Sequence, residues 1–312
     1  KKKQLDIKVV INNLNPLFSD PAILKIGQNL KYDYLVLINN GFNDLISLDD
    51  TMLLSNALYA GLHNHNLDFL SERYLGLTKK KYKELVGVGK KEISFQDVSI
   101  DKAFSYACED ADITLRLWNI FRKSLIKNKL VSFYQNIEKP FVSVVADMER
   151  NGIKINQDIL EELSSDFEKQ LNNLQKKIFL ITQKQFNINS TKQLGQILFE
   201  DLSLPTAKKN KSGGFSTNAE VLEKLSDAGY SIADLILEWR EITKLKSTYT
   251  DSLISNINKL TGRVHSSFQM AGAQTGRLSS TDPNLQNIPI KTSNGKKIRR
   301  AFITEKNKTL LC

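Results

Sequence analysis

An apolar seam of helical period over residues 160–181 is the feature that most constrains the fold of this 312-residue chain. Its members lie three or four positions apart, which places them on one face of an α-helix and excludes a strand. Asn156 precedes the seam, where its side chain is suited to cap the first turn of the helix. The seam is too short for a coiled coil, so an arm of two paired helices is predicted, with residues 231–256 as the partner. The seam residues are Leu160, Leu163, Phe167, Leu171, Leu174, Ile178 and Ile181, and the partner residues are Ile232, Leu235, Trp239, Ile242, Tyr249 and Leu253.

The run from Thr275 to Pro289 is dense in hydrogen-bonding side chains. It contains an arginine, two asparagines, a glutamine and several hydroxyl groups, and Pro283 and Pro289 restrict its backbone. A core strand does not tolerate so many polar groups without partners. The run is therefore suited to hold polar side chains against a ligand with many hydrogen-bonding edges, and a nucleic acid is the obvious candidate.

The charge distribution agrees with an anionic partner. The chain carries a net charge of +10 and its pI is about 9.3, while 41% hydrophobic and 25% charged residues are ordinary values for a folded soluble protein. Residues 290–312 hold seven basic residues against the single acidic residue Glu305, directly after the polar run. A solvated loop and strand edge would also be rich in lysine, and this alternative is the weaker one because the basic patch adjoins the polar run.

Composition excludes several other classes of protein. Cys108 and Cys312 lie far apart, so neither a disulfide framework nor a zinc site is expected, and the reducing cytoplasm is the expected location. No run of eighteen apolar residues occurs, so no membrane association is expected. The first residue is not Met, and the last residues have the pattern of a strand. Both ends are therefore expected to be cuts through a longer protein.

The remaining elements are expected to form an α/β part up to about residue 130 and a more helical part after it. Pro140 near the start of one helix and Asn151-Gly152 at its end are helix boundary signals. Asp50 is expected to cap an apolar helix, and Trp118 and Trp239 are expected in the core. The predicted helices are 28–40, 101–127, 140–150 and 192–200; the predicted strands are 7–11, 263–269, 300–303 and 309–312; a basic Gly-Ser loop is expected at 208–214.

Two pairs of side chains have a spacing that suits metal chemistry. Asn29 and Asp33, and likewise Tyr106 and Asp110, lie four residues apart, so each pair shares one helix face. Magnesium prefers carboxylate oxygens, and two-metal phosphodiester cleavage needs such carboxylates from different elements. A solvated helix face produces the same spacing, so on spacing alone both interpretations stay open.

The sequence around these pairs resembles that of the family A DNA polymerases, the bacterial DNA polymerase I group. The resemblance covers nearly the whole chain, and its segments occur in the order found in that family. They are Gly27–Asp33, Tyr106–Asp112, Glu149–Gly152, Ser190–Leu194, Lys244–Tyr249 and Thr275–Pro289, the last of which is specific enough to indicate the family alone.

The resemblance implies two domains. Residues 1–130 would form a partial 3′–5′ exonuclease domain of RNase H-like α/β fold, and residues 131–312 a mainly helical thumb with the beginning of an α+β palm. Asp33 and Asp110 would then bind Mg²⁺ as catalytic residues, and Tyr106 would position the attacking water. The full-length protein would be a monomeric DNA polymerase in replication and repair, adding nucleotides from deoxynucleoside triphosphates by two-metal chemistry.

The resemblance also implies contacts with primer–template DNA. Arg277 would read the minor-groove edge at the primer terminus, where the acceptors look alike for all correct pairs. Asn284, Gln286 and Asn287 would contact the template and primer backbones or order their loop. Arg240 and Lys244, one turn apart, would meet phosphates, although an exposed basic helix face is the alternative.

Some family motifs do not occur in these residues. The first exonuclease motif, Asp-x-Glu, is absent before Asp33, and the next polymerase motif would begin just after Cys312. The chain alone is therefore expected to catalyse neither nucleotide addition nor efficient excision. Two other hypotheses remain: a free-standing RNase D-like 3′–5′ exonuclease, which leaves the Thr275–Pro289 run unexplained, and a catalytically silent primer–template binding protein.

Overall fold

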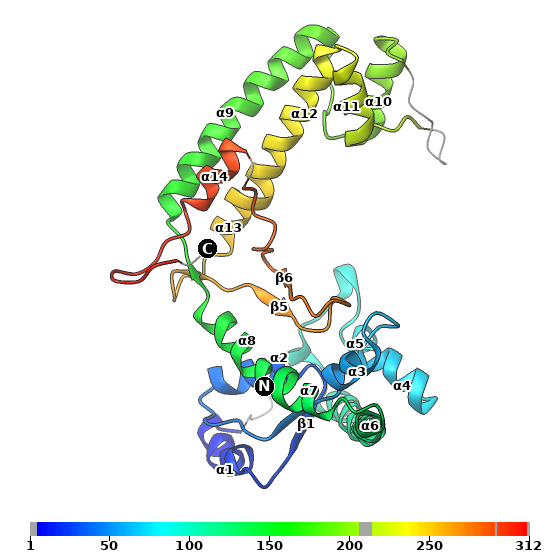
Figure 1. Cartoon of the computed structure of the whole chain (residues 1–312), viewed down its shortest axis with the longest axis vertical. Helices are drawn as coiled ribbons and strands as arrows, with labels where there is room; N and C mark the ends of the chain where they lie inside the picture. Colours follow the sequence, from blue (N-terminus) through cyan, green and yellow to red (C-terminus); the bar gives the residue numbers. More distant parts are fainter. Residues whose placement is uncertain (1–4, 206–213, 291, 311–312) are drawn as a thin grey trace. The chain divides into compact units, whose positions relative to one another are not determined.

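The computed structural model describes residues 5–205, 214–290 and 292–310 (Figure 1). The chain folds into two compact units. Unit 1 comprises the residues up to Gly152 together with Ser266–Asn284, and unit 2 comprises Ile153–His265 together with the residues from Leu285 onward. The domain boundary expected at residue 130 thus lies inside unit 1, and the polar run of residues 275–289 contributes to both units.

Unit 1 is built around a parallel strand pair and a group of helices. Strands β1 and β2 pair in parallel with Ile26 opposite Asp49, and helix α2 connects them. Strands β5 and β6 form a separate antiparallel hairpin, with Phe268 opposite Ser280. The elements are α1 (Ile7–Ser19), β1 (Lys25–Gly27), α2 (Leu30–Asn39), β2 (Leu48–Asp50), α3 (Thr51–Tyr59), α4 (Leu67–Leu75), α5 (Tyr82–Val86), α6 (Ile100–Lys127), α7 (Val131–Phe133), a π-helical stretch (Tyr134–Glu138), α8 (Lys139–Asn151), β5 (Ser267–Gln269) and β6 (Ser279–Thr281).

The strand predicted over residues 7–11 is wrong, because this segment begins helix α1. The side chain of Asp6 accepts a hydrogen bond from the backbone N–H of Lys8 at 2.8 Å and so caps the helix. The β-branched residues Val9, Val10 and Ile11 favour a strand by propensity, yet the cap and the following residues continue the helix to Ser19. The weak strand propensity of these residues is therefore overridden by the cap and by the helical residues that follow.

Helix α6 confirms the helix predicted over residues 101–127. The buried stripe contains Ile113, Leu117, Phe121 and Leu125, which recur every four residues. Leu115 of the same helix lies outside this stripe and is 50% exposed. The core of unit 1 forms where this stripe meets α3, α4 and α8. Its buried residues are Leu53, Leu54, Leu70, Ile113, Leu117, Phe121, Leu125, Tyr134, Val142, Val145 and Met270.

A buried carboxylate connects the starts of two helices in unit 1. Asp50 caps α3 as expected, since its Oδ1 accepts a hydrogen bond from the N–H of Met52 at 2.8 Å. The same carboxylate also accepts hydrogen bonds from the N–H groups of Asn29 at 3.0 Å and Leu30 at 2.8 Å, at the start of α2. Desolvation raises the pKa of Asp50 to about 6, although these backbone hydrogen bonds oppose the shift.

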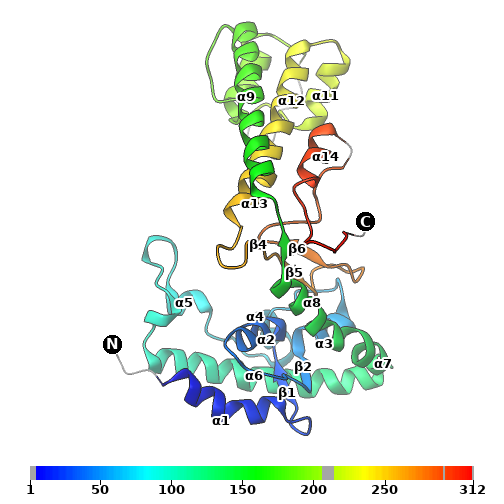
Figure 2. The same cartoon turned by 90° about the vertical axis from the view of Figure 1, so that its left-hand side faces the viewer.

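Unit 2 is a helical arm on a short strand pair. In Figure 2, α9 runs beside α12 along most of its length, as the apolar seam predicts. Asn156 caps α9 by accepting a hydrogen bond from the N–H of Ile159 at 3.2 Å. The elements are β3 (Ile153–Lys154), α9 (Gln157–Thr182), α10 (Thr191–Gln196), a π-helical stretch (Ile197–Asp201), α11 (Ala219–Asp227), α12 (Ser231–Lys244), a second π-helical stretch (Leu245–Asp251), α13 (Ser252–Ser255), β4 (Arg263–Val264) and α14 (Ser293–Arg299).

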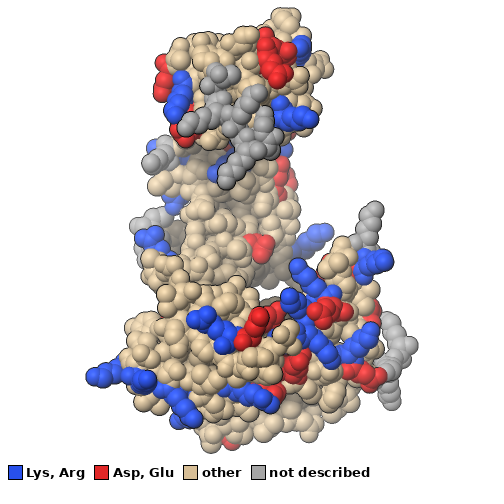
Figure 3. Space-filling model, turned by 90° about the vertical axis from the view of Figure 1, so that its right-hand side faces the viewer, with Lys and Arg blue, Asp and Glu red and all other residues tan. Residues whose placement is uncertain are grey.

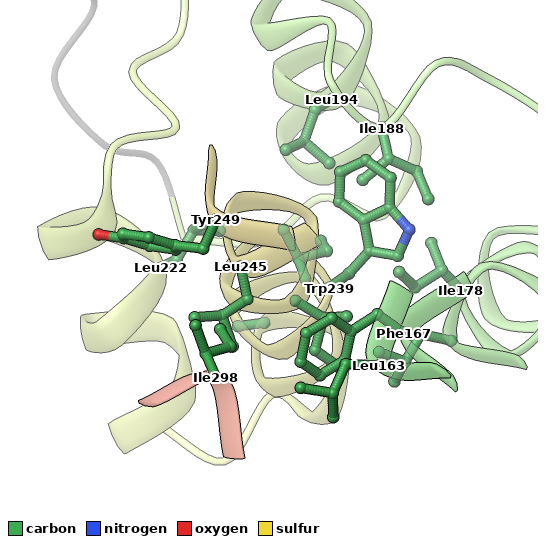
Figure 4. Close-up of a cluster of buried hydrophobic side chains, with 14 of the residues drawn as sticks. Leu163, Phe167, Ile178, Ile188, Leu194, Leu222, Trp239, Leu245, Tyr249 and Ile298 are labelled. Carbon is green, nitrogen blue, oxygen red and sulfur yellow. The ribbon is translucent and has the colours of Figure 1, made fainter. Parts of the chain in front are cut away.

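The core of unit 2 lies between the two long helices and their short neighbours. Phe167 and Ile178 of α9 point toward Trp239 of α12, with Leu194 of α10 beside them (Figure 4). Ile298 of α14 is fully buried in the same cluster. The expected core position of Trp239 is confirmed, because only 8% of it is exposed.

The strand predictions after residue 262 are only partly confirmed. Residues 263–269 divide into β4 of unit 2 and β5 of unit 1, and the Ser266 hydroxyl between them donates to the Pro283 carbonyl at 2.7 Å. Residues 300–303 follow helix α14 and form only an isolated bridge between Phe302 and Ile155. Thr309 and Leu310 form no strand, and residues 311–312 lie outside the described residues, as do residues 208–213 of the expected basic loop. None of the helices in the described part of the chain is long and apolar enough to cross a membrane.

Candidate functional site

A cavity of about 750 Å³ lies in unit 1 between β1, α2, α4 and α6. Asp33 of α2 and both Tyr106 and Asp110 of α6 line it, so the structure brings together the three residues predicted from the two sequence pairs. Asp68 of α4 and Lys79, from the loop before α5, line the same cavity. Five polar or charged groups from separate parts of unit 1 thus face one space.

The turn from β1 into α2 places Asp33 in this cavity. Asn29 adopts the left-handed conformation with φ of +57°, which Asn tolerates better than most residues. Its backbone N–H and that of Leu30 are then directed to the buried carboxylate of Asp50. Asn29 therefore shapes the connection between β1 and α2. Asp33 lies in the first turn of the helix that follows.

Helix α6 supplies Tyr106 and Asp110 one turn apart on the face that borders the cavity. Both side chains contact Lys79, whose own side chain is only 4% exposed. The Lys79 Nζ lies 2.9 Å from Oδ1 of Asp110 and 3.0 Å from Oδ1 of Asp68. It also lies 4.8 Å from the centre of the Tyr106 ring, a distance at which a cation is attracted to the ring face.

The electrostatics of the cavity reflect this arrangement. Desolvation raises the pKa of Asp33 above its ordinary value, and a backbone hydrogen bond partly offsets it. Desolvation and the charge of Asp110 also raise the pKa of Tyr106. Desolvation lowers the pKa of Lys79, but the hydrogen bonds and charges of Asp110 and Asp68 outweigh it, so the net shift is upward. Lys79 is therefore a cation at neutral pH.

The donor atoms around the cavity suit a hard cation. Asp33, Asp68 and Asp110 offer carboxylate oxygens, which Mg²⁺ prefers. Within residues 5–205, 214–290 and 292–310, however, no group of three or more His, Cys, Asp or Glu side chains is close enough together to hold an ion. The chemistry of the donors thus fits Mg²⁺, while the ammonium of Lys79 lies on one of the carboxylate oxygens that would bind it.

Sequence reasoning missed Asp68 and Lys79. Asp68 follows the capping residue Asn66 and has the position of an ordinary first-turn acid. Lys79 begins a run of three lysines, a pattern typical of a solvated loop. The available signal was weak: both residues lie in the segment between the two predicted exonuclease motifs.

The predicted nucleic-acid contacts lie in both units. Arg277 is exposed in the loop that joins β5 to β6, and Asn284 ends the part of the run that belongs to unit 1. Gln286 and Asn287 are exposed in unit 2. The Tyr249 hydroxyl donates a hydrogen bond to the backbone carbonyl of Asn287, which fixes the run beside the second π-helical stretch.

Arg240 and Lys244 differ in their surroundings although both lie on α12. The Arg240 guanidinium donates hydrogen bonds to the carbonyl and, at 3.3 Å, to the hydroxyl of Thr217. Its side chain is half-buried, and desolvation lowers its pKa. Lys244 is exposed. The structure therefore gives Arg240 an internal partner and leaves Lys244 on the surface.

A second concentration of basic residues lies at the C-terminal end of α14. Lys296, Lys297, Arg299 and Arg300 are exposed there, while Ile298 between them is buried in the core. On the face of the molecule that Figure 3 displays, Lys and Arg side chains occur both beside Asp and Glu side chains and away from them. The basic end of α14 is thus a local excess of positive charge in unit 2, next to the polar run in sequence.

Comparison with known proteins places this geometry in a family. The family model for "DNA polymerase family A" matches residues 157–312, and a model for "3'-5' exonuclease" matches residues 2–126. The chain therefore belongs to DNA polymerase family A. Its fold is the expected one: an α/β exonuclease part, a mainly helical thumb and the start of a palm. The match over residues 157–312 does not favour the RNase D-like alternative.

The most similar proteins include bacterial DNA polymerases I. That of Rhizobium leguminosarum is 46% identical over 301 residues, covering 96% of this chain and 30% of that protein. That of Pseudomonas aeruginosa is 40% identical over 314 residues, covering 99% of this chain and 34% of that protein. A solved structure of the POL domain of Pol1 from M. smegmatis, in complex with DNA primer-template and dNTP, is 30% identical with a TM-score of 0.80. It covers 97% of this chain and 49% of that chain.

The chain spans about a third of the length of these DNA polymerases I.

Proposed function

We propose that the chain is the part of a DNA-directed DNA polymerase that grips primer–template DNA and contributes residues to a 3′–5′ proofreading exonuclease site. The observation that carries the proposal is that Asp33, Tyr106 and Asp110, from helices far apart in sequence, line one cavity in a chain of DNA polymerase family A. The full-length protein would extend primers from deoxynucleoside triphosphates during DNA replication and repair. Its monomeric state and cytoplasmic location stay predictions.

In the exonuclease site, Asp33 and Asp110 would hold Mg²⁺ through their carboxylate oxygens. A bound magnesium ion lowers the pKa of a coordinated water and neutralises charge on the phosphodiester. Tyr106 lies one turn before Asp110 on the same helix face, where its hydroxyl is able to orient the attacking water. Two backbone hydrogen bonds to Asp50, from Asn29 and Leu30, hold the start of the helix that carries Asp33.

The exonuclease role is tested with Asp110→Ala in the full-length protein. Loss of the carboxylate should abolish Mg²⁺-dependent trimming of a 3′ end and leave primer extension unchanged. Asp112→Asn is the matched control, because Asp112 is exposed on the same helix and pairs with Arg116 outside the cavity. Trimming by the Asp110→Ala protein at the wild-type rate would remove Asp110 from the site.

In the polymerase part, Arg277 is proposed to read the minor groove from its exposed hairpin loop. The other proposed DNA contacts are Asn284, Gln286, Asn287, Lys244 and Arg240. Arg277→Ala in the full-length protein should slow extension and weaken discrimination against mismatched primer ends. Gln274→Ala, in the same exposed loop, is a suitable control. Normal kinetics of the Arg277→Ala protein on matched and mismatched ends would contradict the assignment.

DNA binding is tested directly on the 312-residue chain. Fluorescence anisotropy with a recessed primer–template should show an affinity that falls steeply with salt. Lys244→Met should reduce the slope of log K against log[salt] by about 1, the value for one lost phosphate contact. Lys224→Met, an exposed lysine paired with Glu220 on α11, should leave the slope unchanged. An affinity independent of salt would refute the proposed DNA grip.

For Arg240 a binding defect alone is ambiguous, because its hydrogen bonds to Thr217 also stabilise the fold. Arg240→Met should therefore be compared with Thr217→Val, which removes one of the same internal hydrogen bonds and leaves the charge. A phosphate contact requires that only Arg240→Met reduces the salt slope.

A further inference from the structure

Lys79 is the one member of its lysine run that is buried. Lys80 and Lys81 are exposed, and the Lys80 ammonium donates to the hydroxyl of Ser105 at 2.9 Å. Lys79 instead places its ammonium against Asp68, Asp110 and the ring of Tyr106 inside the cavity. Two of these three partners are residues to which we assign exonuclease chemistry.

A buried ammonium is costly unless it is paired and hydrogen-bonded. At Lys79 two carboxylate oxygens lie 2.9 Å and 3.0 Å from the Nζ, so the pairing offsets the loss of water. Lys79 in turn affects the two carboxylates. Without Lys79, the carboxylates of Asp68 and Asp110 would lose the positive charge that lies between them and would repel each other.

The oxygen that Lys79 contacts on Asp110 is one that a divalent cation would also use. A second cation at this oxygen would face the electrostatic repulsion of the ammonium a few ångströms away. An ion that binds Asp110 must therefore either move Lys79 or accept a weakened interaction. The position of Lys79 therefore affects both the arrangement of Asp110 and Tyr106 and the affinity of Asp110 for a metal ion.

We propose that Lys79 is an internal counter-ion of the exonuclease cavity, which positions Asp110 and Tyr106 and competes with a divalent cation for Asp110. This inference rests on the proposed function only in taking Asp110 as a metal-binding residue. It makes Lys79 a positioning residue that sets the metal concentration at which the site fills.

The test measures Mn²⁺ binding to the 312-residue chain by electron paramagnetic resonance, at fixed pH and ionic strength. Lys79→Met removes the ammonium and keeps the length of the side chain, and it should tighten Mn²⁺ binding roughly tenfold or more. Lys79→Arg retains the positive charge and should stay within about twofold of wild type. Lys80→Met is the matched control for a charge lost in the same loop but outside the cavity, and it should also stay within about twofold.

Thermal unfolding supplies a second readout. Without metal, Lys79→Met should melt at a lower temperature than wild type, because Asp68 and Asp110 lose their counter-ion. Saturating Mn²⁺ should raise its melting temperature more than that of wild type, since a ligand stabilises the state it binds in proportion to its affinity. If Lys79→Met does not fold, Lys79→Gln removes the positive charge and keeps a hydrogen-bond donor for the two carboxylates, and the same tightening is expected.

The outcomes separate the inference from the proposed function. Unchanged or weaker Mn²⁺ binding in the Lys79→Met chain, an equal gain in Lys80→Met, or no Mn²⁺ binding by any variant would each overturn the counter-ion role. Asp33→Asn in the Lys79→Met background should cancel the gain, and a gain that survives it would place the ion elsewhere and likewise overturn the inference. Primer–template binding and the trimming test on Asp110 are independent of Lys79, so the proposed function stands or fails on those results.

Discussion

The buried ion pair between Lys31 and Glu149 should be the most sensitive single point in unit 1. Lys31 lies on α2 and Glu149 on α8, and their side chains are 8% and 9% exposed. The Glu149 carboxylate also accepts a hydrogen bond from the backbone N–H of Phe268 in β5 at 2.6 Å. One carboxylate thus connects two helices and the hairpin whose loop carries Arg277. Lys31→Met is the perturbation that leaves this carboxylate without its cation.

The size of the effect follows from the burial of the pair. Removing one partner of a buried ion pair costs about 3–5 kcal/mol, because the remaining charge is left uncompensated. Glu149 keeps its hydrogen bond from Phe268, so the loss should fall at the lower end, about 3 kcal/mol. With a denaturant dependence of about 2 kcal/mol per molar urea, the midpoint for unit 1 should fall by about 1.5 M.

The two tryptophans allow each unit to be followed separately. Trp118 belongs to unit 1, where its indole N–H donates to Asp49 at 2.8 Å, and Trp239 belongs to unit 2. Urea unfolding of the Trp239→Phe chain therefore reports on unit 1, and unfolding of the Trp118→Phe chain reports on unit 2. Lys31→Met should lower the first midpoint and leave the second in place.

Two further variants test the reasoning behind this number. Lys31→Met/Glu149→Gln should return to within about 1 kcal/mol of the starting stability, because Gln removes the charge that Lys31 had balanced and still accepts the hydrogen bond of Phe268. Arg116→Met breaks an exposed pair with Asp112 on α6 and should change the stability by no more than about 0.5 kcal/mol. The argument fails if Lys31→Met is as mild as Arg116→Met, or if the double variant is no more stable than the single one.

Three other changes follow from the same kind of reasoning. The pKa of Asp50 is raised to about 6, compared with about 3.9 in an unfolded chain, so the unfolded state loses this proton first as the pH rises. The free energy of unfolding of unit 1 should therefore fall by about 3 kcal/mol between about pH 4 and pH 6. In urea titrations at each pH, Asp50→Asn should remove this pH dependence. Phe167→Ala empties a fully buried position and should cost unit 2 about 3–5 kcal/mol, seen in the midpoint reported by Trp239. Tyr249→Phe removes the hydrogen bond to the carbonyl of Asn287 and should cost unit 2 about 1 kcal/mol by the same measurement.

The helices were predictable where the signals are local. For α9, the apolar seam and the capping residue Asn156 specify the start and the buried face without reference to the rest of the chain. For α8, Pro140 near the start and Gly152 with φ of +57° at the end mark both boundaries. Periodicity and capping depend on neighbours within a few residues, so a single sequence contains the necessary information.

The strands were not predictable for the opposite reason. Strands β1 and β2 are three residues long, too short to show an alternating pattern, and each forms because the other lies beside it. Residues 300–303 have an apolar character that suits a strand, but they follow α14, and Ala301 is buried against the helical core instead. Pairing between distant segments is decided by the whole fold, and local composition does not reveal it.

In the candidate site, too, some residues were predictable from the sequence and others were not. Asp33, Tyr106 and Asp110 were predictable from their spacing and from the resemblance of the surrounding residues to a known family, and the structure places them in one cavity. Lys79 was not, since nothing in a run of three lysines tells which ammonium will be buried. Arg240 shows the converse: it was expected to meet phosphates, with an exposed basic helix face as the alternative, and neither expectation foresaw that the segment before α11 brings Thr217 against it.

The residues around Asp33 show why a sequence motif contains more residues than its chemistry requires. Gln28 accepts a hydrogen bond from the Thr51 hydroxyl at 2.6 Å and donates one to the His65 carbonyl at 2.8 Å, so it joins the turn after β1 to α3 and to the loop before α4. Neither partner lies near Gln28 in sequence. The side chain therefore fixes the position of the turn that precedes Asp33.

Two buried carboxylates hold the first turn of helix α2, which carries Asp33. Asp50 accepts the N–H groups of Asn29 and Leu30 at the start of the helix, and Glu149 pairs with Lys31 one residue later. A carboxylate that is to bind an ion needs a position fixed to a fraction of an ångström, and an exposed first-turn residue cannot secure that position by its own contacts. The buried groups that surround the turn supply the rigidity instead. It follows that substitutions at Asp50 or Lys31 should weaken the metal binding proposed for Asp33 while leaving every proposed ligand in place.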